Sequence, residues 1–160
     1  MQTSFKQAMS RFATGVCVVS YYHPQSGQID GVTISAFSSL SLSPLKILFC
    51  LGNQGTGKDR LAQIERFSVN ILAGKQKALA YQFAGQNRDN IDTFFSDTDG
   101  VPTLIEGLAT LVCHKGNRYA EGDHDIIIGD VEQIFIGDKN RQPLLYYQAT
   151  MVDNYQHTPG

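Results

Sequence analysis

Six hydroxyl side chains lie within one short stretch of the chain, residues 31–51, whose sequence is GVTISAFSSLSLSPLKILFCL. They are Thr33, Ser35, Ser38, Ser39, Ser41 and Ser43. The first two alternate with apolar residues, so one face of a strand carries small polar groups while the other enters a core. Small hydroxyls beside exposed backbone suit a flat, heteroatom-rich ligand, which needs many short hydrogen bonds and little bulk. The alternative is a serine-rich turn that only joins two strands.

A second chemical feature follows directly, the sequence GNQGTGKD at residues 52–59. It fits the Gly-x-x-x-x-Gly-Lys pattern of a triphosphate loop, but Asp59 stands where that loop needs a hydroxyl for Mg²⁺. A weaker interpretation keeps one phosphate, bound near Thr56 and Lys58 at the start of a helix, as a mononucleotide cofactor requires. A third interpretation has Thr56 as a helix cap and Asp59 as its capping-box partner.

The third feature is Gly122-Asp123-His124, which precedes the apolar run DIIIGDV. A lone histidine is usually structural, but this one follows a turn glycine and a carboxylate at the mouth of a strand, where a ligand can reach it. The sequence contains no Cys-x-x-Cys or His-x-x-x-His pair, so no metal site is predicted. The other histidines carry no functional prediction: His23, His114 and His157.

The elements that would position these groups are mostly strands. Helical spacing predicts an amphipathic helix over residues 5–12, a short helix around Leu61 and Ile64, and a third helix over residues 75–85. A short helix with a loop is expected over residues 86–100. Strands are predicted at residues 16–22, 31–43, 44–51, 67–72, 107–116, 123–138 and 143–147. We therefore expect an α+β, mainly β fold, a closed or split barrel with short peripheral helices in a single domain spanning residues 1–160.

Composition narrows the class of protein. With 42% hydrophobic and 18% charged residues in 160, the chain fits a globular protein with a buried core. A net charge of −2 gives no electrostatic footprint for nucleic acid, and no segment has the apolar length of a membrane span or the form of a signal peptide. The three cysteines, Cys17, Cys50 and Cys113, fall in apolar strand-like runs, so we expect reduced, buried thiols and a cytoplasmic location.

Taken together, the chain resembles the short flavin reductases of the FMN-binding split-barrel fold, the reductase components of two-component flavin monooxygenases. The resemblance covers about residues 5–147 and rests on several segments that occur in the family's order. They are RFATGVCVVS, the hydroxyl-rich stretch, FSVNIL with Asn70, LAYQFAG, GLATLVC, GDHDIIIGDV and PLLYY.

The resemblance implies roles for particular residues. The flavin ring and ribityl chain are expected along Thr33, Ser35, Ser38 and Ser39, with Cys50 and Leu51 passing beside the isoalloxazine. Phosphate contacts are expected from Thr56 and Lys58, and from Arg88 beyond the Phe-Ala-Gly segment, in which Phe83 lies near the flavin. The nicotinamide is expected at His124, Asp123 and Tyr147.

The activity that the resemblance implies is reduction of FMN or FAD by hydride transfer from NADH or NADPH, with reduced flavin passed to a partner monooxygenase. No separate catalytic acid or base is expected, because the flavin supplies the chemistry. The resemblance also implies a homodimer. The alternatives are a non-catalytic flavin-binding or electron-transfer protein on the same fold, a P-loop-like nucleotide-binding protein, and a split-barrel protein that binds no cofactor.

Overall fold

The computed structural model describes residues 1–54, 57–85 and 90–155. The helices are α1 (Gln2–Ser10), α2 (Gly57–Ala62) and α3 (Lys77–Phe83), with two 3-10 turns, η1 (Gly74–Gln76) and η2 (Ile91–Phe94). The strands are β1 (Thr14–Gly15), β2 (Cys17–Tyr22), β3 (Ile29–Ile34), β4 (Phe37–Leu42), β5 (Leu45–Gly52), β6 (Arg66–Ile71), β7 (Phe95–Thr98), β8 (Val101–Leu104), β9 (Ala109–Glu121), β10 (His124–Ile136), β11 (Leu145–Tyr147) and β12 (Thr150–Val152). The mainly β fold expected from the sequence is confirmed.

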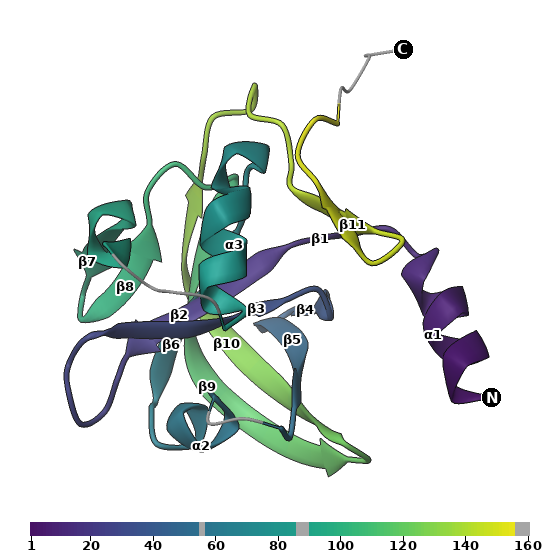
Figure 1. Cartoon of the computed structure of the whole chain (residues 1–160). Helices are drawn as coiled ribbons and strands as arrows, with labels where there is room; N and C mark the ends of the chain where they lie inside the picture. The colour runs from purple at the N-terminus through teal and green to yellow at the C-terminus, as the bar shows by residue number, and fades with distance from the viewer. Residues whose placement is uncertain (55–56, 86–89, 156–160) are drawn as a thin grey trace.

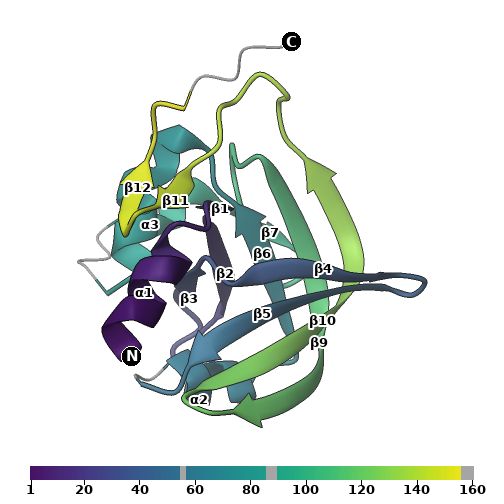
Figure 2. The ribbon, with the colours of Figure 1, turned by 90° about the vertical axis from the view of Figure 1, so that its right-hand side faces the viewer.

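One seven-stranded sheet forms the body of the molecule, with strand order β3-β2-β6-β9-β10-β5-β4 (Figures 1 and 2). Every neighbouring pair in it is antiparallel. Its two edge strands, β3 and β4, are separated in the chain only by Ser35 and Ala36. Because so short a connection cannot span an open sheet, the sheet must curve until its two edges meet at this corner. The hydroxyl-rich stretch therefore lies at the corner where the two edge strands approach each other.

The inside of the curved sheet is filled by apolar side chains in period-two alternation. On β5, for example, Ile47, Phe49 and Leu51 are buried, while the residues between them are half-buried on the outer face. Phe49 packs edge-on against Phe67 of β6, with ring centroids 5.6 Å apart. This cluster fixes the register of β5 against β10, and with it the position of the loop after β5.

A second core lies between the sheet and α3. Phe83 at the end of α3 packs edge-on against Phe95 of β7, with ring centroids 5.8 Å apart. A Cβ on Gly31 would lie 2.3 Å from the carbonyl oxygen of Val19 and 3.2 Å from the Phe83 ring. Only glycine fits there, so α3 packs close against β3.

A buried polar network joins the two cores at Asn70. Its Nδ2 donates to the Val18 carbonyl at 2.9 Å, and its Oδ1 accepts from the Leu104 amide at 2.9 Å and the Thr110 hydroxyl at 3.0 Å. Ser20 and Ser68 complete the network, and each donates to the carbonyl of Pro102. Asn70 thus ties β2, β8 and β9 together and holds the β7–β8 hairpin against the sheet.

The helix α1 stands off from the body of the molecule (Figure 1). The expected helix is present, but none of its residues is buried. Phe5, Met9 and the following Phe12 are each more than half exposed. A small sheet of β1, β11 and β12 lies next to it. None of the described helices is long and apolar enough to cross a membrane.

Candidate functional site

The corner between β3 and β4 holds the predicted hydroxyl residues. The Thr33 hydroxyl donates to the carbonyl oxygen of Ala80 on α3 at 2.6 Å. Its proton is therefore committed, and only its lone pairs can meet a ligand. Ser35 is half-buried at the corner, whereas Ser38 and Ser39 are exposed on β4. The Ser38 hydroxyl donates to the Ser39 carbonyl at 2.9 Å.

A pocket of about 190 Å³ opens at this corner. It is lined by Val16, Thr33, Ile34, Ser35, Ala84, Tyr146 and Met151. The lining combines two hydroxyls with apolar side chains and an aromatic ring, which suits one end of a flat polar heterocycle. The predicted residue Phe83 is buried beneath β3, so the neighbouring Ala84 lines this pocket instead.

The end of β5 reaches the same corner, because the Cys50 amide donates to the Ala36 carbonyl at 2.9 Å. Leu51 is buried in the core, so its backbone is the part that can face a ligand. Cys50 is half-buried on the outer face of the sheet, opposite Ile126 of β10. The expectation that all three cysteines are buried is thus wrong for Cys50, since period-two alternation turns its side chain away from the core that Phe49 and Leu51 enter.

The Gly122–His124 turn lies directly against the loop that follows β5. His124 is paired with Gly52, and the Asn53 amide donates to the Asp123 carbonyl at 2.8 Å. The His124 ring lies over Gly52, with Nε2 3.6 Å from the position that a Cβ on this glycine would take. The loop after β5 and the histidine, 71 residues apart in the chain, thus form one continuous surface.

The His124 ring is oriented by its neighbour, with Nδ1 2.7 Å from Oδ1 of Asp123. This hydrogen bond lowers the pKa of Asp123, and the charge of Lys6 on α1 adds to the effect. Asp123 is therefore a carboxylate at neutral pH and accepts, so the Nδ1 atom carries the proton. In the neutral ring, Nε2 is then left as an acceptor.

Lys58, the lysine of the GNQGTGKD sequence, has an ion-pair partner inside the protein. Lys58 Nζ lies 3.5 Å from Oδ2 of Asp125, and Arg118 Nη2 lies 2.5 Å from the same oxygen. The Asp125 side chain is fully buried, directly after His124 in the chain. Lys58 therefore ties α2 to the first residues of β10. The other two predicted phosphate contacts, Thr56 and Arg88, lie outside the described residues.

Tyr147 is on β11, in the small sheet beside α1, and is about two-fifths exposed. In both views β11 lies well apart from the β9–β10 turn that carries His124 (Figures 1 and 2). One copy of the chain therefore does not bring Tyr147 to His124.

Sequence reasoning missed five of the pocket residues, and two of these, Tyr146 and Met151, belong to a hairpin that it did not predict. They face each other across β11 and β12, joined by a tight turn in which Gln148 and Ala149 have positive φ. Such turns are usually marked by glycine or asparagine, and neither residue type occurs at these two positions. The pattern thus carried no signal for this hairpin.

The structure does not provide the strand–helix context that a triphosphate loop requires. Such loops join a strand of a parallel sheet to a helix, whereas every strand pair in the described part of the chain is antiparallel. The helix that follows, α2, has only six residues.

Comparison with known proteins identifies the family of the chain. Residues 9–154 match the model of the flavin reductase like domain. The reductase component of a 4-hydroxyphenylacetate 3-monooxygenase from Thermus thermophilus is 33% identical over 149 residues, covering 92% of this chain and 93% of that protein. An NADH-dependent flavin reductase from a Rhodococcus species is 30% identical over 146 residues, covering 91% and 82%. Among solved structures, the styrene monooxygenase flavin reductase from Pseudomonas putida S12 superposes with a TM-score of 0.86 at 29% identity, covering 97% of this chain and 99% of that one.

Proposed function

The chain belongs to the flavin reductase like family, and from that premise we propose that it reduces FMN or FAD with NADH or NADPH and supplies reduced flavin to a partner monooxygenase. The observation that carries this proposal is the meeting of two features, the hydroxyl-lined corner of the sheet and the Gly122–His124 turn, on either side of the end of β5. The hydroxyl-lined corner suits a flavin, and the Gly122–His124 turn suits the nicotinamide-bearing substrate.

The residues at the corner fit a flavin. Its ring has carbonyl oxygens and an N–H along one edge and an apolar surface along the other. Thr33, with its proton committed to Ala80, can accept from such an N–H, and Ser35 can donate to a carbonyl oxygen. Val16 and Met151 offer apolar contact in the same pocket. We assign the ring to this corner, with Ser38, Ser39 and Cys50 along its border, and the phosphate to Thr56, Lys58 and Arg88.

When bound, the flavin accepts the hydride, so the protein has to align two ring systems and exclude side reactions. His124 suits the alignment step. Its Nδ1 proton is held by Asp123, and its Nε2 acceptor can take an N–H from the carboxamide of a nicotinamide. No proton needs to leave or enter the ring during the transfer, so His124 acts by binding.

We further propose that the protein works as a homodimer. The apolar stripe of Phe5, Met9 and Phe12 is not covered by any of the residues that the structure describes. A second uncovered apolar area lies on the outer face of the sheet, a groove of about 420 Å³. Its apolar lining is Leu40, Leu48, Tyr119, Ile126 and Ile128. Two uncovered apolar surfaces on one chain can cover each other in a symmetric pair, which also gives Tyr147 a route to the partner's nicotinamide site.

The domain and location predictions accompany this proposal. We treat residues 1–160 as one flavin reductase domain with a split-barrel sheet. A cytoplasmic location is supported by three free thiols, two of them buried. The direct test of the function is NADH oxidation by the purified protein with added FMN or FAD, compared with protein or flavin alone. Rapid oxidation that needs both components supports the proposal, and no flavin-dependent oxidation contradicts it.

A further inference from the structure

A larger cavity, about 510 Å³, lies at the other end of β3 from the flavin corner. Ile29 and Asp30 of β3 line it, and Arg60 of α2 forms one wall. The remaining lining comes from two loops: His23, Ser26 and Gln28 before β3, and Asn90, Ile91 and Asp92 at η2. The proposed flavin and nicotinamide contacts use none of these side chains.

This cavity and the flavin corner border the same edge strand. Thr33 and Ser35 belong to the corner, and Ile29 and Asp30 belong to the cavity. Because a strand rises about 3.3 Å per residue, the step from Ser35 back to Asp30 is roughly 16 Å. A mononucleotide with its ring at the corner would end short of the cavity, whereas the second half of an extended dinucleotide would reach it.

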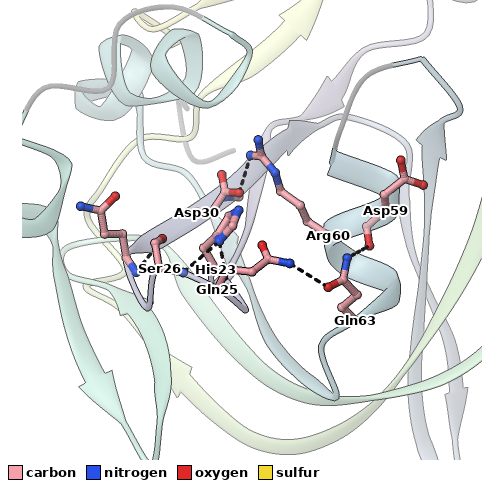
Figure 3. A network of polar contacts seen from close by, with 9 residues as sticks. His23, Gln25, Ser26, Asp30, Asp59, Arg60 and Gln63 are labelled. Atoms are coloured by element: carbon pink, nitrogen blue, oxygen red, sulfur yellow. Dashed lines mark hydrogen bonds and ion pairs between the residues drawn. The ribbon is translucent and has the colours of Figure 1, made fainter.

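The cavity has a fixed cationic wall. Arg60 Nη1 donates to Oδ2 of Asp30 at 2.6 Å, and the Asp30 carboxylate is buried (Figure 3). The guanidinium carries five N–H donors in a planar fork, and this bond uses one of them. About a third of the Arg60 side chain is exposed, so the group can also meet a phosphate oxygen at the mouth of the cavity.

His23 supplies a flat ring held in one orientation. Its Nδ1 accepts from the backbone amides of Gln25 and Ser26, each at 3.3 Å (Figure 3). A ring nitrogen that accepts carries no proton, so the imidazole is neutral with its proton on Nε2. The turn itself is tied to the residue that follows α2, because the side-chain Nε2 of Gln25 donates to Oε1 of Gln63 at 3.1 Å. Two walls of the cavity are therefore held in place without any ligand.

The remaining lining has the chemistry that recognises a nucleoside. Ile29 and Ile91 offer apolar surface for a base, Gln28 and Asn90 offer amide donors and acceptors, and Asp92 can accept from an amine or a sugar hydroxyl. Among the described lining residues, the carboxylate of Asp92 makes the interior unfavourable for a free phosphate. A neutral purine nucleoside fits this interior, because its base and sugar can meet the apolar and amide side chains while its phosphate stays outside at Arg60.

We propose that this cavity binds the adenosine half of FAD, so that the protein accepts FAD and holds it more tightly than FMN. The assignment rests on the proposed flavin reductase function. Because NADH also carries adenosine, the same chemistry could serve either dinucleotide. The cavity is assigned to FAD because it continues from the flavin corner along β3, while His124 lies at the start of β10.

The test is the ratio of FAD to FMN affinity, measured by calorimetric titration of the oxidised flavins without NADH. Two variants remove different contacts. His23→Ala deletes the ring, and Arg60→Lys keeps a cation for the buried Asp30 but loses the planar fork. In each we expect the ratio to fall about tenfold, the scale of one base–aromatic or one bidentate contact. The matched control is His114→Ala, an exposed histidine on β9, which should leave the ratio unchanged. Circular dichroism confirms that each variant is folded.

An unchanged ratio in both folded variants overturns the proposal. A ratio that stays constant while the KM for NADH rises with FMN as the acceptor also overturns it, because the adenosine would then be that of NADH. If the unaltered protein binds neither flavin, the proposed function itself fails, which is distinct from a bound flavin with an unchanged ratio.

Discussion

Nδ1 of His124 lies 2.7 Å from Oδ1 of Asp123, and the pair stands directly over Gly52 at the end of β5. The hydrogen bond sets which nitrogen of the ring carries a proton and which way the ring faces. It also lowers the pKa of Asp123, so the side chain is a carboxylate at neutral pH. Two adjacent residues thus form a ready-made acceptor beside the loop expected to border the flavin.

We expect His124→Ala to raise the KM for NADH about tenfold or more, with flavin affinity changed less than twofold, since one charge-assisted or well-placed contact is lost. Steady-state kinetics at saturating FMN, together with calorimetric titration of FMN, separate the two effects. His114→Ala serves again as the control. Equal losses in NADH use and flavin binding would make His124 a structural residue.

Buried thiols give a prediction about pH and reactivity. Burial raises the pKa of Cys17 to about 12, and burial with nearby carboxylates raises that of Cys113 to about 12. At pH 8 both are thiols, so a thiolate-selective reagent should modify at most one cysteine per native chain, Cys50, and all three in urea. Because both folded pKa values are raised, their contribution to stability is present below the ordinary value of 9.0 and is lost as pH rises from there towards 12.

Mass spectrometry of the labelled protein identifies the sites, and Cys50→Ser should abolish native labelling. Rapid native labelling of Cys17 or Cys113 would contradict the packing described.

Asn70 should matter for stability more than for chemistry. Replacing it by Ala leaves the Val18 carbonyl and the Leu104 amide without their buried partner, so we expect unfolding to become easier by about 2–3 kcal/mol. Urea unfolding followed by circular dichroism measures the change. Asn140→Ala, an exposed asparagine in the loop after β10, should change it by less than about 0.5 kcal/mol. Equal effects of the two variants would show that the network is dispensable.

The proposed dimer can be tested on α1. Phe5→Glu combined with Met9→Glu places two charges on the uncovered stripe, and we expect the dimer to dissociate in light-scattering chromatography. Gln7→Glu adds a charge on the opposite side of the same helix and should leave the dimer intact. If the double variant stays dimeric, the interface lies elsewhere, and if the unaltered chain is a monomer, the homodimer proposal is wrong.

The sequence predicted the elements that its local pattern specifies strongly. The apolar runs of β2, β6 and β10 and the helix ending before Gly85 lie where expected. Thr33 and Ile34 face opposite sides of β3, as their alternation indicates.

What the sequence could not predict depends on contacts between distant segments. The β7–β8 hairpin lies in a polar stretch without strand alternation, and Asn70 and Phe83 hold it from elsewhere in the chain. The engagement of Lys58 by Asp125 joins residues 67 positions apart. The cavity at His23 and Arg60 likewise forms only when a turn, a strand edge and a helix meet, so none of its residues carried a local signal.

The most direct test of the central claim is anaerobic stopped-flow absorbance at the oxidised-flavin band. Protein mixed with excess FMN or FAD is combined with NADH and, separately, with NADPH. The account predicts bleaching over many turnovers with at least one flavin and one nicotinamide donor. Flavin that binds but bleaches no faster than in protein-free solution would instead indicate a flavin carrier on the same fold and would contradict the account.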